Sequence, residues 1–333
     1  MTGTGQTSAT VDMDALFEKD RSIWPTHNIS GAKVLHLLVQ HAGHADTTWG
    51  ETHAADGLGL AFCYMRGDYR PIYASNVDLP QRAGELLGCR LEATWATDPD
   101  EAWAFIKAGL DADKPVKMAG PEDSIVCAYM DADGVADRTL WARGVGGPAM
   151  EGEVSWEKFA EWIPVFVPLI GGGLYYVAEK RQKPPVQETV SILAKRVVEW
   201  QENHPAVGRF GDSSHYGVSA LEQFLADLLQ PDIEIPGEYI DCIAINFQHG
   251  ARAALADYFR DAAQKLSGDM AALVGDISEN YRTAAERLAR FQSEGLGKDR
   301  TTESGRQAIG ETVGTALEAE KRILAGMERL AVG

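Results

Sequence analysis

A change of pattern at residues 178–188, "AEKRQKPPVQE", limits what this chain of 333 residues can fold into. Before this segment, short runs rich in β-branched and aromatic residues alternate with stretches of helical period, and after it nearly every stretch has helical period. Two adjacent prolines in a charged cluster are typical of a linker. We therefore predict an α+β fold with a flexible Thr/Gly/Ser-rich tail over 1–12, an α/β domain over 13–183 and an all-α helical bundle over 184–333.

Within the first domain, apolar spacing predicts a helix over 30–42, followed by a His-rich loop. Residues 79–120 have the pattern helix, strand, helix, strand, with Asp98 and Pro99 opening the second helix. Residues 124–145 are typical of two strands joined at an Asp/Gly turn, and we expect a hairpin there. The glycines of "IGGGLYY", residues 170–176, are interpreted as turns.

Charge and composition exclude several classes of partner. The formal net charge is −18 and no Lys/Arg run interrupts it, so binding to nucleic acid or to an anionic membrane surface is not expected. The four cysteines are scattered without a C-x-x-C pair, which favours a reducing compartment. Neither a secretory signal nor a run of 18 apolar residues is present, and we predict a cytoplasmic protein.

Four segments carry a resemblance to a known family. Residues 27–32, "HNISGA", precede an apolar helix; "DGLGLAF", residues 56–62, has a Gly-rich turn; and "DSIVCAYMDADG", residues 123–134, has a strand running into a turn. These motifs resemble the butirosin biosynthesis protein H type of papain-like acyltransferase, which is similar to bacteriocin-leader cysteine peptidases. The helix "FQHGARAALADYFRDAA" resembles the helical domain that often follows. The resemblance implies a papain-like domain, and an acyl-carrier thioester or an amine as substrate.

The residues that would perform the chemistry differ from the family pattern. A papain-like site needs a thiolate at a helix N-terminus and an imidazole to pair with it. Asn28 stands at the thiol position, Asp123 or Ser124 stands at the imidazole position, and the orienting Asp of the family falls near Arg143. We therefore expect that cysteine acyl transfer through the usual triad is absent. Buried, inert thiols are the favoured interpretation of Cys63 and Cys127. The candidate catalytic positions are His27, Asn28, Cys63, Asp123 and Ser124.

A metal site is a separate hypothesis. Five of the eight histidines fall between His27 and His53, together with acidic residues, and imidazole and carboxylate are ligands of zinc, iron and manganese. His41, His44, Glu51 and His53 would form such a divalent-metal site. The alternative is a solvated His-rich loop, because the spacing matches no standard ligand signature.

The second domain offers a candidate ligand site. The segment "GDSSHYG", residues 211–217, is expected to cap a helix, and the resemblance implies that His215 and Tyr216 lie near a cleft. His249 and Arg252 stand at i and i+3 of one helix and could hold an anionic or acyl group, although an interhelical polar pair is the alternative. The last helix has an apolar face that needs a cover, either its own bundle or a second copy of the chain.

Two functions stay open from the sequence. The first is a biosynthetic tailoring enzyme of small molecules, with amide or acyl chemistry run by a displaced nucleophile or a metal, acting on a small-molecule or acyl-carrier-bound substrate. The second is a pseudoenzyme that binds a ligand or a partner protein in the old cleft. Loss of the thiol and the imidazole favours the second, and the histidine cluster favours the first.

Overall fold

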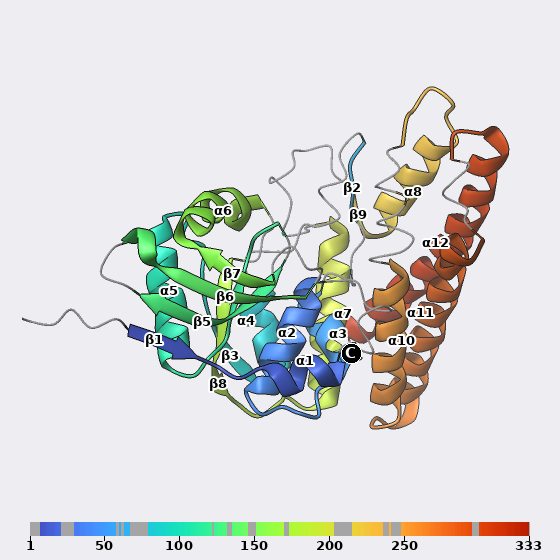
Figure 1. Cartoon of the computed structure of the whole chain (residues 1–333). Helices are drawn as coiled ribbons and strands as arrows, with labels where there is room; N and C mark the ends of the chain where they lie inside the picture. The colour runs from blue at the N-terminus through green and yellow to red at the C-terminus, as the bar shows by residue number, and fades with distance from the viewer. Residues whose placement is uncertain are drawn as a thin grey trace, which may run out of the picture. The chain divides into compact units, whose positions relative to one another are not determined.

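The chain forms two compact units in this computed structural model (Figure 1): Met1–Thr47 with Ser75–Lys183, and Thr48–Ala74 with Pro184–Gly333. The second unit resumes at Pro184, within the expected linker. The expected single boundary is incomplete, however, because Thr48–Ala74 belongs to the second unit and not to the first. The structure describes residues 7–20, 30–57, 60, 63–66, 79–121, 123–131, 135–145, 151–169, 173–202, 215–235, 240, 248–294 and 300–332.

The first unit contains an antiparallel sheet of seven strands among the described residues, in the order β3-β8-β4-β5-β6-β7 with β1 paired to β5. An α+β class is therefore confirmed. The strands are β1 (Thr7–Thr10), β3 (Cys89–Thr94), β4 (Val116–Met118), β5 (Ser124–Asp131), β6 (Thr139–Gly144), β7 (Gly152–Ser155) and β8 (Leu174–Lys180). The helices of this unit are α1 (Asp14–Asp20), α2 (Ser30–His41), α4 (Leu79–Leu86), α5 (Pro99–Asp111) and α6 (Trp156–Leu169).

The two faces of the sheet have different covers. Helices α5 and α6 pack on one face, where Trp103, Phe159 and the alternate strand residues Val116, Met118 and Leu140 form a buried core. Helix α2 contacts β4, β5 and β8. Since side chains alternate along a strand, Lys117 and Trp141, which stand next to core residues, project from the opposite face.

Strand β5 has partners along both edges. On one edge β6 pairs from Ser124↔Gly144 to Met130↔Thr139; on the other, β4 pairs with the first half of β5 and β1 with the second half. The register with β6 shifts between Val126 and Ala128, so Cys127 is the extra residue of a β-bulge. The bulge turns the Cys127 thiol toward the Trp141 carbonyl, at 3.6 Å.

The second unit is a helical bundle that also includes Thr48–Ala74 from the N-terminal half, a segment that we call the arm. Helix α3 contacts α10, and β2 pairs with β9, so both segments of the arm lie in the bundle. The elements are α3 (Trp49–Asp56), β2 (Cys63–Tyr64), α7 (Val186–Glu202), β9 (His215–Tyr216), α8 (Gly217–Leu228), α10 (Gln248–Ala263), α11 (Gly268–Glu294) and α12 (Glu303–Val332). The apolar face of α12 is buried against α7, α8 and α11 of the same unit, so its own bundle covers it.

Three sequence expectations are wrong. The flexible tail over 1–12 contains β1, which pairs with β5. The His-rich loop contains α3, which a Thr48–Glu51 capping box begins. His215 and Tyr216 form β9 and not a helical first turn, and α8 begins after them at Gly217, whose φ of +60° suits glycine.

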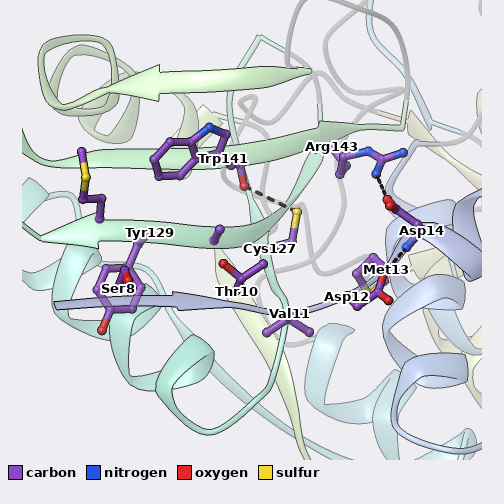
Figure 2. A pocket seen from close by; sticks show the side chains of 12 residues that line it. Ser8, Thr10, Val11, Asp12, Met13, Asp14, Cys127, Tyr129, Trp141 and Arg143 are labelled. Atoms are coloured by element: carbon purple, nitrogen blue, oxygen red, sulfur yellow. Dashed lines mark hydrogen bonds and ion pairs between the residues drawn. The ribbon is translucent and has the colours of Figure 1, made fainter.

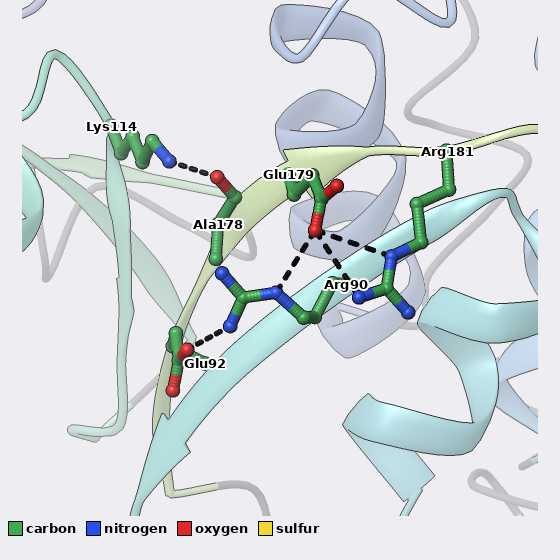
Figure 3. A network of polar contacts seen from close by, with 6 residues as sticks. All are labelled: Arg90, Glu92, Lys114, Ala178, Glu179 and Arg181. Carbon is green, nitrogen blue, oxygen red and sulfur yellow. Dashed lines mark hydrogen bonds and ion pairs between the residues drawn. The ribbon is translucent and has the colours of Figure 1, made fainter.

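The β3 edge of the sheet carries a ladder of opposite charges (Figure 3). Arg90 of β3 faces Glu179 of β8 across the strands and donates to its carboxylate at 3.2 Å, and it also donates to Glu92. Hydrogen bonds from Arg90 and Arg181 lower the pKa of Glu179. Charged side chains on an edge strand discourage pairing with another chain, so the ladder protects this edge from aggregation.

Gly50 tests the packing of the arm against the bundle. A Cβ at Gly50 would lie 2.7 Å from the Ala254 carbonyl oxygen and 3.0 Å from Tyr258, because α3 crosses α10 at this point. We expect Gly50→Ala to lower the free energy of urea unfolding by ~1–3 kcal/mol through overpacking. Gly275→Ala on α11 is the matched control, because nothing lies within 4 Å of its Cβ position. Equal stability of the two variants would contradict this packing.

Candidate functional site

A buried ion pair lies at the start of β5. Asp123 precedes β5 and lies 3.1 Å from the Lys117 ammonium of β4. Both residues are buried, at 9% and 2% exposure, and Lys117 also donates to the Gly173 carbonyl at 3.2 Å. A Lys–Asp pair holds opposite charges in place, but it offers neither a nucleophile nor an imidazole base.

The first turn of α2 lies at the same end of the sheet. The Lys33 ammonium of α2 is 3.5 Å from the Val145 carbonyl, and the Val145 amide in turn donates to the Asp123 carbonyl at 3.4 Å. The structure therefore brings the start of α2 close to the start of β5. Ser124 is fully buried and points to the α5–α6 face. His27 and Asn28 lie outside the described residues.

Farther along the chain, an open groove runs over the second half of β5 (Figure 2). It has a volume of about 810 Å³ and lies between β1, β5, β6 and the start of α1. Cys127, Ala128 and Met130 form its floor, and Trp141 and Arg143 project from β6. Ser8 and Thr10 contribute hydroxyls from β1, and Asp12 and Asp14 contribute carboxylates. A volume of this size is in the range of small-molecule sites, about 300–1,000 Å³.

Arg143 closes the α1 end of the groove. Its guanidinium forms an ion pair with Asp14, lies 3.6 Å from Glu151, and stacks over the Phe17 ring at 4.5 Å. This cation is therefore already held by two carboxylates. The sequence did not predict the groove, because one wall of it is β1.

The thiols in the described part of the chain are poorly suited to nucleophilic attack. Burial raises the pKa of Cys63 far above its ordinary value. Burial also raises the pKa of Cys127 to about 11, although the charge of Arg143 lowers it in part. The pKa of Cys89 is likewise raised by burial to about 11, although the charges of Lys183 and Lys180 lower it in part. A reactive cysteine needs a lowered pKa, so the inert interpretation of Cys63 and Cys127 fits these surroundings.

The predicted metal ligands do not converge. Among the described residues, no three His, Cys, Asp or Glu side chains are grouped so that they could hold an ion. In the first unit, His44 donates to the Gly88 backbone carbonyl at 2.8 Å, and His41 donates to the Asp113 backbone carbonyl at 3.3 Å. Glu51 and His53 lie on α3 in the second unit. Glu51 accepts from the Thr48 amide at 2.9 Å in the capping box, and His53 is buried 6.3 Å from the Trp49 ring. The proposed metal site is therefore not formed by these four side chains.

The ligand residues predicted in the second unit are engaged in strand pairing and an ion pair within that unit. His215 and Tyr216 pair with Tyr64 and Cys63 across β2 and β9, and Tyr216 is buried. Arg252 is 1% exposed and donates to Glu320 at 2.5 Å. The hollow beside Arg252 has a volume of about 10 Å³, which suits one water molecule and no acyl group. Arg252 is thus an interhelical ion-pair residue. The His249 side chain lies outside what the structure describes.

Asp227 organises the arm of the second unit, a role that the sequence did not reveal. Its fully buried carboxylate accepts from Tyr64 at 2.8 Å, from Arg66 at 2.5 and 2.9 Å, and from Gln223 at 2.8 Å. Burial alone raises the pKa of Asp227, but the hydrogen bonds from Arg66, Tyr64 and Gln223 outweigh it and hold the pKa below its ordinary value. The carboxylate therefore fixes β2 onto α8.

Comparison with known proteins adds no relative: no family model matches the sequence, and no curated protein matches it. In the described part of the chain, no helix has both the length and the apolar composition needed to cross a bilayer.

The buried ion pair predicts a large stability effect. Asp123→Asn removes one charge and leaves the Lys117 ammonium without its carboxylate, and breaking a buried pair in this way costs about 3–5 kcal/mol. We expect a loss of that order in the free energy of unfolding, measured with urea. The double variant Asp123→Leu, Lys117→Met is the control, because removing both charges avoids the uncompensated ammonium. A double variant less stable than Asp123→Asn would contradict the assignment.

Asp227 predicts a pH-dependent effect. Because its pKa is lower in the folded than in the unfolded chain, its ionised form stabilises the fold above the unfolded pKa, about 3.9, and this contribution is lost as the pH falls through the folded pKa. Asp227→Asn is expected to cost about 2–3 kcal/mol at pH 7. The difference between wild type and variant should shrink below about pH 4 in urea unfolding at stepped pH. A difference that stays constant down to pH 2 would refute the role of the ionised carboxylate.

Proposed function

We propose that this chain is a small-molecule-binding protein on a papain-like scaffold that has lost cysteine-dependent acyl transfer. The observation that carries the proposal is the Lys117–Asp123 ion pair at the start of β5, where the resemblance implies an imidazole. The pair is buried and its ammonium donates to the Gly173 carbonyl, so an incoming thioester carbonyl would meet neither a base nor a nucleophile there.

The thiol surroundings support the same conclusion. With a pKa of about 11, Cys127 is ionised in roughly one molecule in a thousand at pH 8, and burial disfavours the Cys63 thiolate still more. The competing hypothesis of acyl or amide chemistry at a displaced or metal-dependent site has less support, since burial raises the pKa of the thiols and no group of three His, Cys, Asp or Glu side chains among the described residues could hold a metal ion.

The groove supports binding as the retained activity. It lies over β5, the strand that Asp123 of the ion pair directly precedes, and Arg143 at its end stands two residues before Val145, which contacts Lys33 of α2. Binding needs only the shape and polar groups of the groove, and no ionised thiol.

An acyl-adduct experiment tests the loss of chemistry. The folded chain is incubated at pH 8 with acetyl- and benzoyl-N-acetylcysteamine, thioesters that mimic an acyl carrier, and its intact mass is measured. We expect no acyl adduct, whereas urea-unfolded protein should alkylate with iodoacetamide at all four cysteines. One acyl group per folded chain, lost in Cys63→Ser or Cys127→Ser but kept in Cys242→Ser, would overturn the proposal.

A further inference from the structure

We infer that the groove over β5 binds a planar aromatic cation. The inference deepens the proposed binding function, on which it rests for treating the groove as a ligand site. The groove offers three features at once: an indole side chain, a floor of small side chains on a sheet face, and carboxylates that outnumber the cations in its wall. Each feature restricts a different property of the ligand.

The charge of the groove favours a cation. Its lining contains two carboxylates, Asp12 and Asp14, and one guanidinium, Arg143. That guanidinium is already engaged by Asp14 and is 3.6 Å from Glu151, so little of its charge is available to an anionic ligand. The Asp12 side chain accepts from the Asp14 amide at 3.0 Å, which leaves its second carboxylate oxygen available to a ligand donor. The chain as a whole has a net charge of −18, which favours association with cations over anions.

The indole of Trp141 favours an aromatic ligand. Trp141 is only half-buried and stands on the groove face, since its β6 neighbours Leu140 and Ala142 belong to the opposite core. Figure 2 shows it above the strand that bears Cys127, with the carboxylates of Asp12 and Asp14 at the other end of the groove. A cation over the face of a Trp ring gains ~0.5–2 kcal/mol beyond the area buried.

The floor favours a flat ligand. Cys127 and Ala128 are short side chains in the middle of the groove, and the bulge at Cys127 places both toward it. The space beside Trp141 is therefore bounded by the flat surface of a sheet. The Ser8 and Thr10 hydroxyls of β1 lie along one side and can accept hydrogen bonds from ring nitrogen donors.

Proflavine, a planar aromatic cation, is a suitable probe, and 9-anthracenecarboxylate is an anion of similar shape. Binding of each to the full chain is measured by isothermal titration calorimetry at low and high salt. We expect one proflavine per chain, weaker binding in high salt, and at least tenfold weaker binding of the anion. Asp12→Asn and Trp141→Leu should each weaken proflavine binding by about three- to tenfold. Asp276→Asn on α11 and Trp162→Leu on the α6 face are the matched controls and should leave it unchanged.

The outcomes separate the ligand class from the binding function. If the anion binds at least as tightly as proflavine and Trp141→Leu abolishes that binding, the ligand class is wrong while the groove is still a binding site. Proflavine binding that ignores both groove variants, or that the control variants weaken equally, overturns the inference. If neither probe binds, the inference is also overturned, and the acyl-adduct experiment still decides whether thiol chemistry has been lost.

Discussion

The pairing of β5 along both of its edges is the constraint on which the first unit depends. Six of its eight residues pair with β6 on one side, and on the other side three pair with β4 and four with β1. Because buried backbone groups must be hydrogen-bonded, this double pairing fixes the strand in the middle of the sheet. The Asp123 carboxylate at its start and the Cys127 bulge at its centre are held by the same ladder. The ion pair and the groove are therefore two consequences of one strand.

The Lys117–Asp123 pair is better explained as a device of specificity than of stability. Removing two charges from water costs several kcal/mol per ion, and their attraction only approximately offsets this. A hydrophobic pair of the same volume could serve β4 and β5 as well. The ion pair, however, permits only the register in which Lys117 pairs with Ile125, because only there does the Lys117 ammonium reach the Asp123 carboxylate. A shift by one residue would bury the ammonium without its carboxylate.

Local signals in the sequence predicted local structure well. Helix α5 begins where Asp98 and Pro99 indicate, since the Asp98 carboxylate accepts from the amides of Asp100 and Glu101 in the first turn. The hairpin of β5 and β6 follows from alternating apolar residues on neighbouring strands. In contrast, β1 has four mostly polar residues and becomes a strand only by pairing with β5, more than a hundred residues away. No local pattern could reveal it, and without β1 the groove is invisible.

The histidines show that closeness in sequence is also a poor guide to which side chains share a site. Thr48-Trp-Gly-Glu51 has the spacing of a capping box, a signal of helix α3 that the sequence did contain. Closeness in sequence nevertheless suggested a shared metal ion for His44 and His53, whereas the chain leaves the first unit at Thr47 and enters the second at Thr48. Spacing predicts ligand sets only where one helix or one turn carries all the ligands.

The path of the chain also limits what either unit can do alone. The bundle over 184–333 receives α3, β2 and the Tyr64 and Arg66 side chains from the arm, and Asp227 would be a buried carboxylate without two of its donors if the arm were absent. A carboxylate left in that state costs several kcal/mol, so the arm belongs to the folded bundle as much as α8 does. The sequence pattern therefore changes at Pro184, but we do not expect residues 184–333 to fold stably without the arm.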